Sequence, residues 1–333
     1  MSVQHLFKVL ILFYLQVFLS HRTLNAAIIG KDGSYAVLRG STFRMTCTPK
    51  DESRMEGSVV WTDEEGREII NARFTKLDND DLEVTNAYVG DSGTYKCKYR
   101  SLATPEGLNK VYERKLLVYE LAGHKFISSA VFDVSKQDEK AVIDMLKDLL
   151  TYKVCTRDLC APGVVRTTKC EDKSCEFFIS YEALNQVADD QCDEECIRTK
   201  MLNGLKQAES VVEKELQTLA QEPERRLKAD MKTFNTKHLI TCRAGFHLVK
   251  AHYKRCFPCM PGYYSEPNTV ECSMCDVGYY QESYGKKDCD KCDEGKTTDS
   301  KGSKSRDDCI GAEDKKGILG GIRDGILSIF SGR

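Results

Sequence analysis

The sequence predicts a multidomain protein that consists of an all-β sandwich, a disulfide-containing α+β module and an elongated ladder of disulfide-linked repeats. Three observations predict this organisation. Short segments of alternating polarity lie between two cysteines near the N-terminus. Apolar residues at both strand and helix spacing, together with six cysteines, fill the middle of the chain. Near the C-terminus, a unit that begins with cysteine and carries a glycine recurs four times.

The composition excludes few classes of folded protein but limits the expected partners. The 333 residues include 49 basic and 51 acidic side chains, for a formal net charge of -2. This balance gives no general reason to expect binding to nucleic acid or to an anionic membrane. The length indicates two or three domains. The 16 cysteines form an even number, which is compatible with complete pairing and no free thiol.

The N-terminus indicates the redox compartment that the chain enters. Residues 6–19 form an apolar run with a basic residue near its start, and small residues follow at Ser20, Ala26 and Ala27. The run is short for a bilayer span and has the layout of a secretory signal peptide. We therefore predict a signal peptide over residues 1–25, with a buried N-terminal helix as the alternative. Because no second long apolar run follows, we expect a secreted, extracellular protein without a transmembrane anchor.

The segment 27–119 has the pattern of a small β-sandwich. Phe43, Met45 and Cys47 alternate with polar residues, which is typical of a strand with one buried face. The same alternation or an apolar run predicts further strands at residues 59–61, 82–84 and 116–119.

A sequence motif identifies this sandwich more closely. Trp61 follows Cys47 by fourteen residues, and the stretch from Asp91 to Cys97 reads D-S-G-T-Y-K-C. Over about 90 residues this pattern closely resembles the immunoglobulin domain. The resemblance implies a Cys47–Cys97 bridge between two sheets, with Trp61 packed on the bridge and Tyr95 hydrogen-bonded back to the chain. The structural residues of the motif are then Trp61, Asp91, Gly93 and Tyr95.

Residues 120–241 have the pattern of an α+β module, and we recognise no family in them. Strands are predicted at residues 130–134 and 176–181, and Val164 and Val165 belong to another. The stretch from Ser135 to Asp138 is a variant of the capping box and predicts the start of a helix. The apolar residues of that helix recur at helical spacing at Val142, Ile143, Leu146, Leu149 and Leu150.

A second, charged helix in this module carries an apolar stripe from Leu202 to Leu219 and ends near Pro223. The stripe spans less than three heptads, so we predict a face packed on a sheet, with a coiled-coil dimer seam as the alternative. Acidic residues at 189–195 predict a solvated helix start, with a calcium site as the alternative. The pairing of the module's cysteines stays open: Cys155, Cys160, Cys170, Cys175, Cys192 and Cys196.

Residues 242–309 contain four similar cysteine units. The opening cysteines are 17, 16 and 17 residues apart, at Cys242, Cys259, Cys275 and Cys292. The closing cysteines are Cys256, Cys272, Cys289 and Cys309. In an oxidising compartment this spacing predicts disulfides, and in a reducing one it is typical of zinc sites. The simplest disulfide pattern joins each opening cysteine to its own closing cysteine, although many other pairings remain open.

The opening cysteine, the glycine-aromatic pair and the C-x-x-C junctions resemble the ephrin-receptor-like, TNF-receptor-like cysteine-rich repeats of extracellular proteins. The resemblance implies an elongated ladder that serves as a stalk or as a ligand-contact surface. The last unit departs from the pattern, because Lys296 replaces the aromatic residue and a longer loop precedes Cys309. We expect the tyrosines of this region to cover disulfides, with partner contact as the alternative: Tyr263, Tyr264, Tyr279, Tyr280 and Tyr284.

Residues 310–333 predict an amphipathic or flexible tail. Apolar residues from Ile318 to Phe330 would line one helical face, and the glycines among them lower helix propensity. Weak contact with a membrane surface is one alternative for this tail. Release as a peptide after Lys316 is another.

The sequence carries no sign of catalysis. It has no G-x-S-x-G, no H-E-x-x-H and no glycine-rich phosphate loop, so we predict no catalytic residue, no cofactor and no metal site. We expect His247 and His252 to be exposed on the first repeat. We predict a secreted recognition or adhesion protein that binds an extracellular protein partner, not nucleic acid, through its immunoglobulin-like and cysteine-rich modules. The alternatives are a structural or matrix spacer and the precursor of a C-terminal amphipathic peptide.

Overall fold

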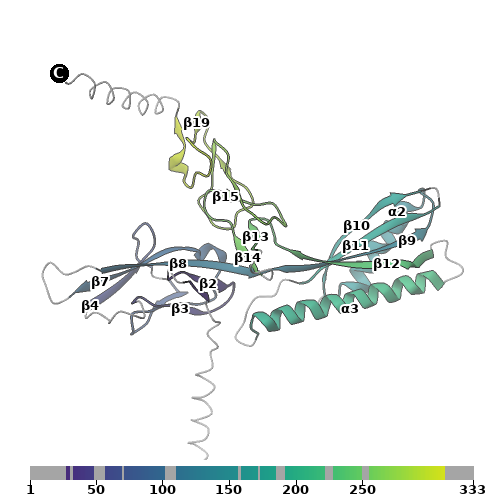
Figure 1. Cartoon of the computed structure of the whole chain (residues 1–333), viewed down its shortest axis with the longest axis horizontal. Coiled ribbons are helices and arrows are strands. Elements are labelled where there is room, and N and C mark those ends of the chain that lie inside the picture. The colour runs from purple at the N-terminus through teal and green to yellow at the C-terminus, as the bar shows by residue number, and fades with distance from the viewer. Residues whose placement is uncertain are drawn as a thin grey trace, which may run out of the picture. The chain divides into compact units, whose positions relative to one another are not determined.

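The computed structural model describes residues 28–30, 33–48, 57–69, 71–101, 110–156, 159–171, 173–184, 192–221, 228–249 and 255–311. The predicted signal peptide, and the predicted tail beyond Gly311, lie outside these residues. The chain divides after Tyr119 into two compact units, with residues 187–195 assigned to the first. Among the described residues, no helix is long and apolar enough to cross a membrane. Figure 1 labels many of the elements of both units.

The first unit is a β-sandwich, as the alternation predicts. One sheet has the order β1-β2-β8-β7-β4, with β2 parallel to β8, and the other has the order β3-β6-β5. The strand bounds are Ile28–Ile29 (β1), Tyr35–Leu38 (β2), Phe43–Met45 (β3), Gly57–Thr62 (β4), Phe74–Lys76 (β5), Leu82–Val84 (β6), Gly93–Ser101 (β7) and Lys110–Leu121 (β8).

Side chains from both sheets form the core of this sandwich. In β3 and β6 every second residue is buried, so one face of each strand is apolar and the other is solvated. The largest contributions come from fully or almost fully buried aromatic and aliphatic residues: Phe43, Met45, Trp61, Leu82, Tyr99 and Leu116.

The second unit begins with the α+β module, whose existence the sequence also predicts. Its four strands form an antiparallel sheet in the order β10-β11-β9-β12. The chain order β-α-β-β-α-β with this strand order is the split β-α-β arrangement of ferredoxin-like folds. The bounds are Gly123–Asp133 (β9), Glu139–Leu149 (α2), Leu150–Val154 (the π-helical turn η2), Ala161–Cys170 (β10), Cys175–Glu182 (β11), Glu194–Gln221 (α3) and Lys228–Thr241 (β12).

Alternation along β9 and β11 defines the two faces of this sheet. The even-numbered residues of β9 and the odd-numbered residues of β11 are buried, and the apolar sides of α2 and α3 are buried as well. Figure 1 shows α3 alongside the sheet, as predicted for its apolar stripe.

Two predictions in this module need correction. The predicted strand 130–134 is only the end of β9, which begins at Gly123 because the alternating burial extends that far back. The predicted capping box does not form: α2 begins at Glu139, and its N-cap residue Asp138 makes no side-chain hydrogen bond to the backbone. Instead, the hydroxyl of Ser135 donates to the Asp138 carboxylate at 2.8 Å.

The cysteine-rich repeats follow β12 as four small hairpin units. Their strands are Phe246–Leu248 (β13), Arg255–Pro258 (β14), Tyr263–Tyr264 (β15), Ser273–Met274 (β16), Tyr279–Tyr280 (β17), Asp290–Lys291 (β18), Lys296–Thr297 (β19) and Ile310–Gly311 (β20). The last strand therefore extends two residues into the segment predicted as tail. In the first hairpin, β14 also pairs with Glu120 and Leu121 at the end of β8.

Candidate functional site

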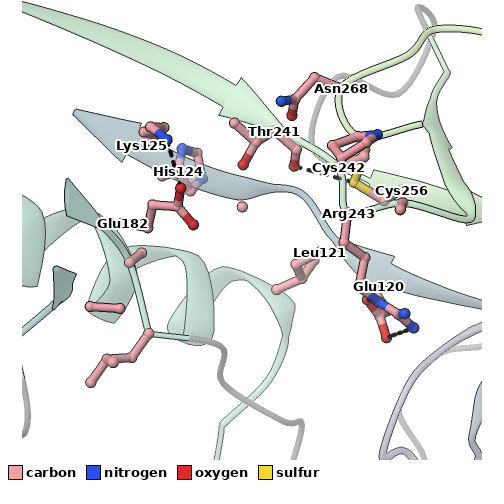
Figure 2. Close-up of a pocket in the computed structure, with 16 residues that line it drawn as sticks. Glu120, Leu121, His124, Lys125, Glu182, Thr241, Cys242, Arg243, Cys256 and Asn268 are labelled. Carbon is pink, nitrogen blue, oxygen red and sulfur yellow. Dashed lines mark hydrogen bonds and ion pairs between the residues drawn. A yellow bond between two sulfur atoms is a disulfide. The ribbon is translucent and has the colours of Figure 1, made fainter. Parts of the chain in front are cut away.

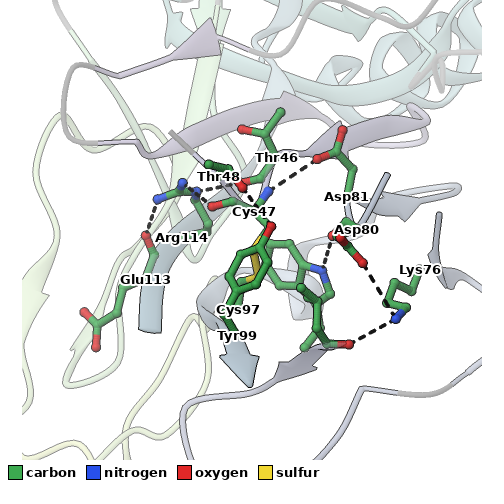
Figure 3. The surroundings of a disulfide bond; sticks show 12 residues. Thr46, Cys47, Thr48, Lys76, Asp80, Asp81, Cys97, Tyr99, Glu113 and Arg114 are labelled. Atoms are coloured by element: carbon green, nitrogen blue, oxygen red, sulfur yellow. Dashed lines mark hydrogen bonds and ion pairs between the residues drawn. A yellow bond between two sulfur atoms is a disulfide. The ribbon is translucent and has the colours of Figure 1, made fainter. Parts of the chain in front are cut away.

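A buried disulfide lies at the centre of the sandwich (Figure 3). Cys47 is bonded to Cys97, and both residues are almost fully buried. The indole N–H of Trp61 donates to the carbonyl of Asp80 at 2.9 Å, which satisfies its only donor in the core. A Cys–Trp–Cys core of this kind stabilises a sandwich and leaves its outer faces free for other roles.

Arg114, which the sequence analysis did not single out, is buried beside this disulfide. Its guanidinium donates to the carbonyls of Thr46 at 2.8 Å, Cys47 at 2.7 Å and Glu113 at 3.0 Å. It therefore ties the end of β3 to β8. The sequence did contain a signal for this burial: Arg114 occupies an inward position between Tyr112 and Leu116 on a strand of alternating polarity.

The motif from Asp91 to Cys97 holds a second buried charge. The Asp91 carboxylate accepts two hydrogen bonds from Arg73, at 2.6 and 2.8 Å, and one from the backbone N–H of Tyr88 at 2.9 Å. The Tyr95 hydroxyl donates to the Asp91 carbonyl at 2.6 Å, and burial raises the pKa of Tyr95. Gly93 begins β7. Sequence reasoning missed Arg73, because its distance of 18 residues from Asp91 follows no local rule.

Apart from the Cys47–Cys97 bridge, the disulfides fall in two groups. In the repeats each opening cysteine is bonded to the closing cysteine of its own unit. In the α+β module Cys155 is bonded to Cys160 and Cys170 to Cys175, and Cys192 and Cys196 are also disulfide-bonded. All 16 cysteines are thus oxidised, which is typical of proteins in oxidising compartments.

The glycine of the second repeat unit, Gly262, has a definite structural role. Gly262 has a φ of +85° and donates from its N–H to the carbonyl of Gln281 in the next unit at 2.7 Å, while its own carbonyl accepts from the N–H of Cys275 at 2.9 Å. A Cβ atom there would overlap the carbonyl oxygen of Gly302. The position requires glycine both for its φ and for its space.

The fourth unit folds although it departs from the repeat pattern. Lys296 occupies the position of the aromatic residue, and its strand β19 pairs with β20. Arg306 in the longer loop donates to both oxygens of Asp293, at 3.1 and 2.9 Å. Its backbone N–H also donates to Glu282 of the preceding unit at 2.8 Å. These contacts hold the loop in place without an aromatic side chain.

The predicted exposure of His247 is wrong. His247 is half-buried, with Nδ1 3.2 Å from Sγ of Cys272, and burial lowers its pKa. The nearby Cys259 could only bind metal as a thiolate, but its sulfur is bonded to Cys272. His252 lies outside the described residues. Of the predicted acidic cluster, Glu194 and Glu195 lie in the first turn of α3, where acids are favoured.

A cavity of about 530 Å³ lies where the α+β module meets the first repeat. Figure 2 shows the Lys125–Glu182 ion pair on one side and the Arg243–Glu120 ion pair on the other, at 2.8 and 2.7 Å. Each charge is therefore already neutralised by its neighbour. The arrangement offers neither a nucleophile with a base nor an unpaired charge for a ligand.

Two histidines that are 114 residues apart meet beside this cavity. Nδ1 of His124 on β9 is 2.8 Å from Nε2 of His238 on β12, and the rings are stacked. Burial, followed by the charges of His238 and Arg198, lowers the pKa of His124 to about 4. His124 is therefore neutral at physiological pH, and the pair is a structural link between the two strands.

Comparison with known proteins gives two matching families. Residues 33–106 match the immunoglobulin domain, and residues 262–309 match the family described as tyrosine-protein kinase ephrin type A/B receptor-like. These matches confirm both resemblances, so the chain combines an immunoglobulin domain with an ephrin-receptor-like cysteine-rich domain. No curated protein sequence matches the chain.

Solved structures resemble the chain over a limited part of its length. The neural ectodermal development factor IMP-L2 is 26% identical, with a TM-score of 0.22, over 27% of this chain and 40% of its own. Sidekick-1 immunoglobulin domains 1–4 are 20% identical, with a TM-score of 0.22, over 27% and 25%. Extracellular domains 3–5 of Drosophila OTK are 24% identical, with a TM-score of 0.20, over 25% and 27%. The chain thus covers less than half of each of these structures.

Proposed function

We propose that the chain is a secreted, non-enzymatic recognition or adhesion protein that binds an extracellular protein partner through its immunoglobulin and cysteine-rich modules. The predicted signal peptide and the complete oxidation of the cysteines support an extracellular location. The proposal includes secretion and the existence of a protein partner. It also includes the domain boundaries 27–119, 120–241 and 242–309.

The observation that carries the proposal is a set of exposed apolar side chains between residues 260 and 279 of the cysteine-rich repeats. Between 38% and 57% of each such side chain is exposed at Met260, Val270, Met274, Val277 and Tyr279. A contiguous apolar patch on a folded surface marks an interaction site, and we propose that these side chains form such a patch. By contrast, Phe246, which follows the glycine of the first unit, is fully buried and lies under Arg243. The aromatic residue after the repeat glycine is therefore part of the core in the first unit, as Phe246, but is exposed to solvent in the third unit, as Tyr279.

The test uses the full-length protein secreted from cultured cells, presented to a panel of displayed extracellular domains. We expect saturable, sub-micromolar binding to at least one of them. A variant with Met260→Ser and Met274→Ser should weaken this binding, whereas Val164→Ser, a matched exposed residue on β10, should not. A protein that is secreted and folded but binds none of the panel would contradict the proposal and favour the spacer alternative.

A further inference from the structure

The two outer faces of the immunoglobulin sandwich differ in charge and polarity. On the sheet of β3, β5 and β6, the central outward row is Arg44, Glu83 and Thr75. Arg44 and Glu83 form an ion pair at 2.8 Å, so this row is polar and internally neutralised. This row therefore offers a partner neither an unpaired charge nor an exposed apolar side chain.

The outer face of β4, β7 and β8 is composed differently. The strand register places Val60, Lys98 and Val111 in one row across the three strands. Residues directly opposite each other in a sheet point to the same side, so both valines flank the lysine on the outer face. Val60 is 38% exposed and Val111 47% exposed, so two apolar side chains face solvent on either side of one cation.

Two further lysines lie on the same face. Lys96 and Lys115 occupy outward positions on β7 and β8, and Glu113 is the acid among the outward residues of these strands. Lys96 donates to the backbone carbonyl of Glu64 at 3.1 Å and not to a carboxylate. Within the described residues, Lys96, Lys98 and Lys115 form no ion pair. We call Val60, Lys96, Lys98, Val111 and Lys115 the valine–lysine face.

We propose that the valine–lysine face is the surface by which the immunoglobulin domain binds a protein partner, and that the partner presents a carboxylate flanked by apolar side chains. This inference rests on the proposed recognition function and names the surface for it. Two exposed valines gain free energy only from contact with another apolar group. Lys98 attracts a carboxylate, and Lys96 and Lys115 add positive charge on the same face, so charge complementarity and apolar contact favour the same partner. A sulfated polysaccharide would use the lysines but would leave the valines uncovered.

The test selects ligands from a displayed library of random peptides with the full-length protein as target. We expect the selected peptides to contain Asp or Glu with large apolar residues on both sides. Their binding should weaken roughly tenfold or more in Lys98→Glu and in the double variant Val60→Ser with Val111→Ser. Lys98→Arg should retain binding, and Thr75→Asp, on the opposite outer face, should leave it unchanged. Higher salt should weaken the binding as well.

Three results would overturn this assignment. The first is that the library yields no acidic-apolar peptides. The second is that the selected peptides bind the variants as well as the wild type. In the third, heparin binds the wild type while acidic peptides do not, and the valine substitutions have no effect. Because Val60, Val111 and Thr75 are exposed and Lys98 is only half-buried, circular dichroism of the full chain suffices to show that the variants fold. If an extracellular domain binds the chain and Lys98→Glu leaves that binding intact, this face is wrong but the recognition function stands.

Discussion

Replacing the repeat glycines by alanine separates two physical effects that the structure places at different positions. Gly262 and Gly295 have nearly the same backbone conformation, with φ of +85° and +77°. A Cβ atom at Gly262 would overlap the carbonyl oxygen of Gly302 and would lie 3.0 Å from its carbonyl carbon, whereas a Cβ at Gly295 meets nothing within 4 Å. Gly262→Ala therefore changes both conformation and packing, and Gly295→Ala changes conformation alone.

The expected magnitudes follow from these two effects. Holding alanine at positive φ costs about 1 kcal/mol at either position. The overlap at Gly262 involves backbone atoms that cannot rotate away, so it adds roughly 1–3 kcal/mol. The loss should appear where Gly302 is held, because its N–H donates to the carbonyl of Cys275 at 2.8 Å.

Hydrogen exchange of the full-length protein, read by mass spectrometry on peptides from residues 275–305, measures this loss locally. Gly262→Ala should accelerate exchange there roughly tenfold or more beyond Gly295→Ala. Equal acceleration in the two variants would refute the packing argument, because only conformation would then matter. No effect in either variant would refute the requirement for positive φ as well.

Three further predictions concern buried polar groups. Arg114→Met leaves three backbone carbonyls of the sandwich without their donor and should cost about 2–4 kcal/mol, read as a lower melting temperature of the first unit by calorimetry; an unchanged melting temperature would show that Arg114 is dispensable. Asp91→Asn leaves the Arg73 charge poorly matched and should cost roughly 2–4 kcal/mol, and adding Arg73→Met should recover part of it; a further loss in the double variant contradicts the pairing. The folded chain favours neutral His124, whose pKa falls from 6.5 to about 4. Stability should therefore be complete above pH 6.5 and fall by up to about 3 kcal/mol as the pH drops towards 4. Hydrogen exchange of β9 and β12 as a function of pH measures this loss. His124→Asn, which cannot contact His238 as an imidazole does, should flatten this pH profile. An unaltered profile would assign the pH dependence to other groups.

The sequence predicted the parts of the fold that local patterns encode. The alternation of Phe43, Met45 and Cys47, and the D-x-G-x-Y-x-C motif, indicated the sandwich, which the fold and the family match confirm. The helical stripe from Leu202 to Leu219 indicated α3, because one buried side at helical spacing is visible in sequence.

The elements that the sequence did not reveal lack such a local signal. Strand β12 is mostly exposed, with Ala229 its buried residue, and its register with β9 shifts between Asp230 and Asn235. An edge strand with one buried residue and a shifted register has no alternation to detect. The His124–His238 contact depends on the pairing of that strand, so it could not be predicted before β12 itself.

For the two candidate surfaces, too, the residue types could be predicted from the sequence but their arrangement could not. The tyrosines of the repeats could be named from the sequence, but their burial could not, and Tyr279 alone among them is exposed by 38%. The row of Val60, Lys98 and Val111 depends on the register of three strands. A one-residue shift in either pairing would separate the two valines, so this surface is a property of the folded sheet.

The most direct test of extracellular recognition is saturation binding of the secreted full-length protein to the displayed extracellular domains, before and after reduction of its disulfides. We expect sub-micromolar, saturable binding that is lost on reduction, because the disulfides hold the repeats and the sandwich in their folded form. The absence of saturable binding by the oxidised protein would contradict a recognition role.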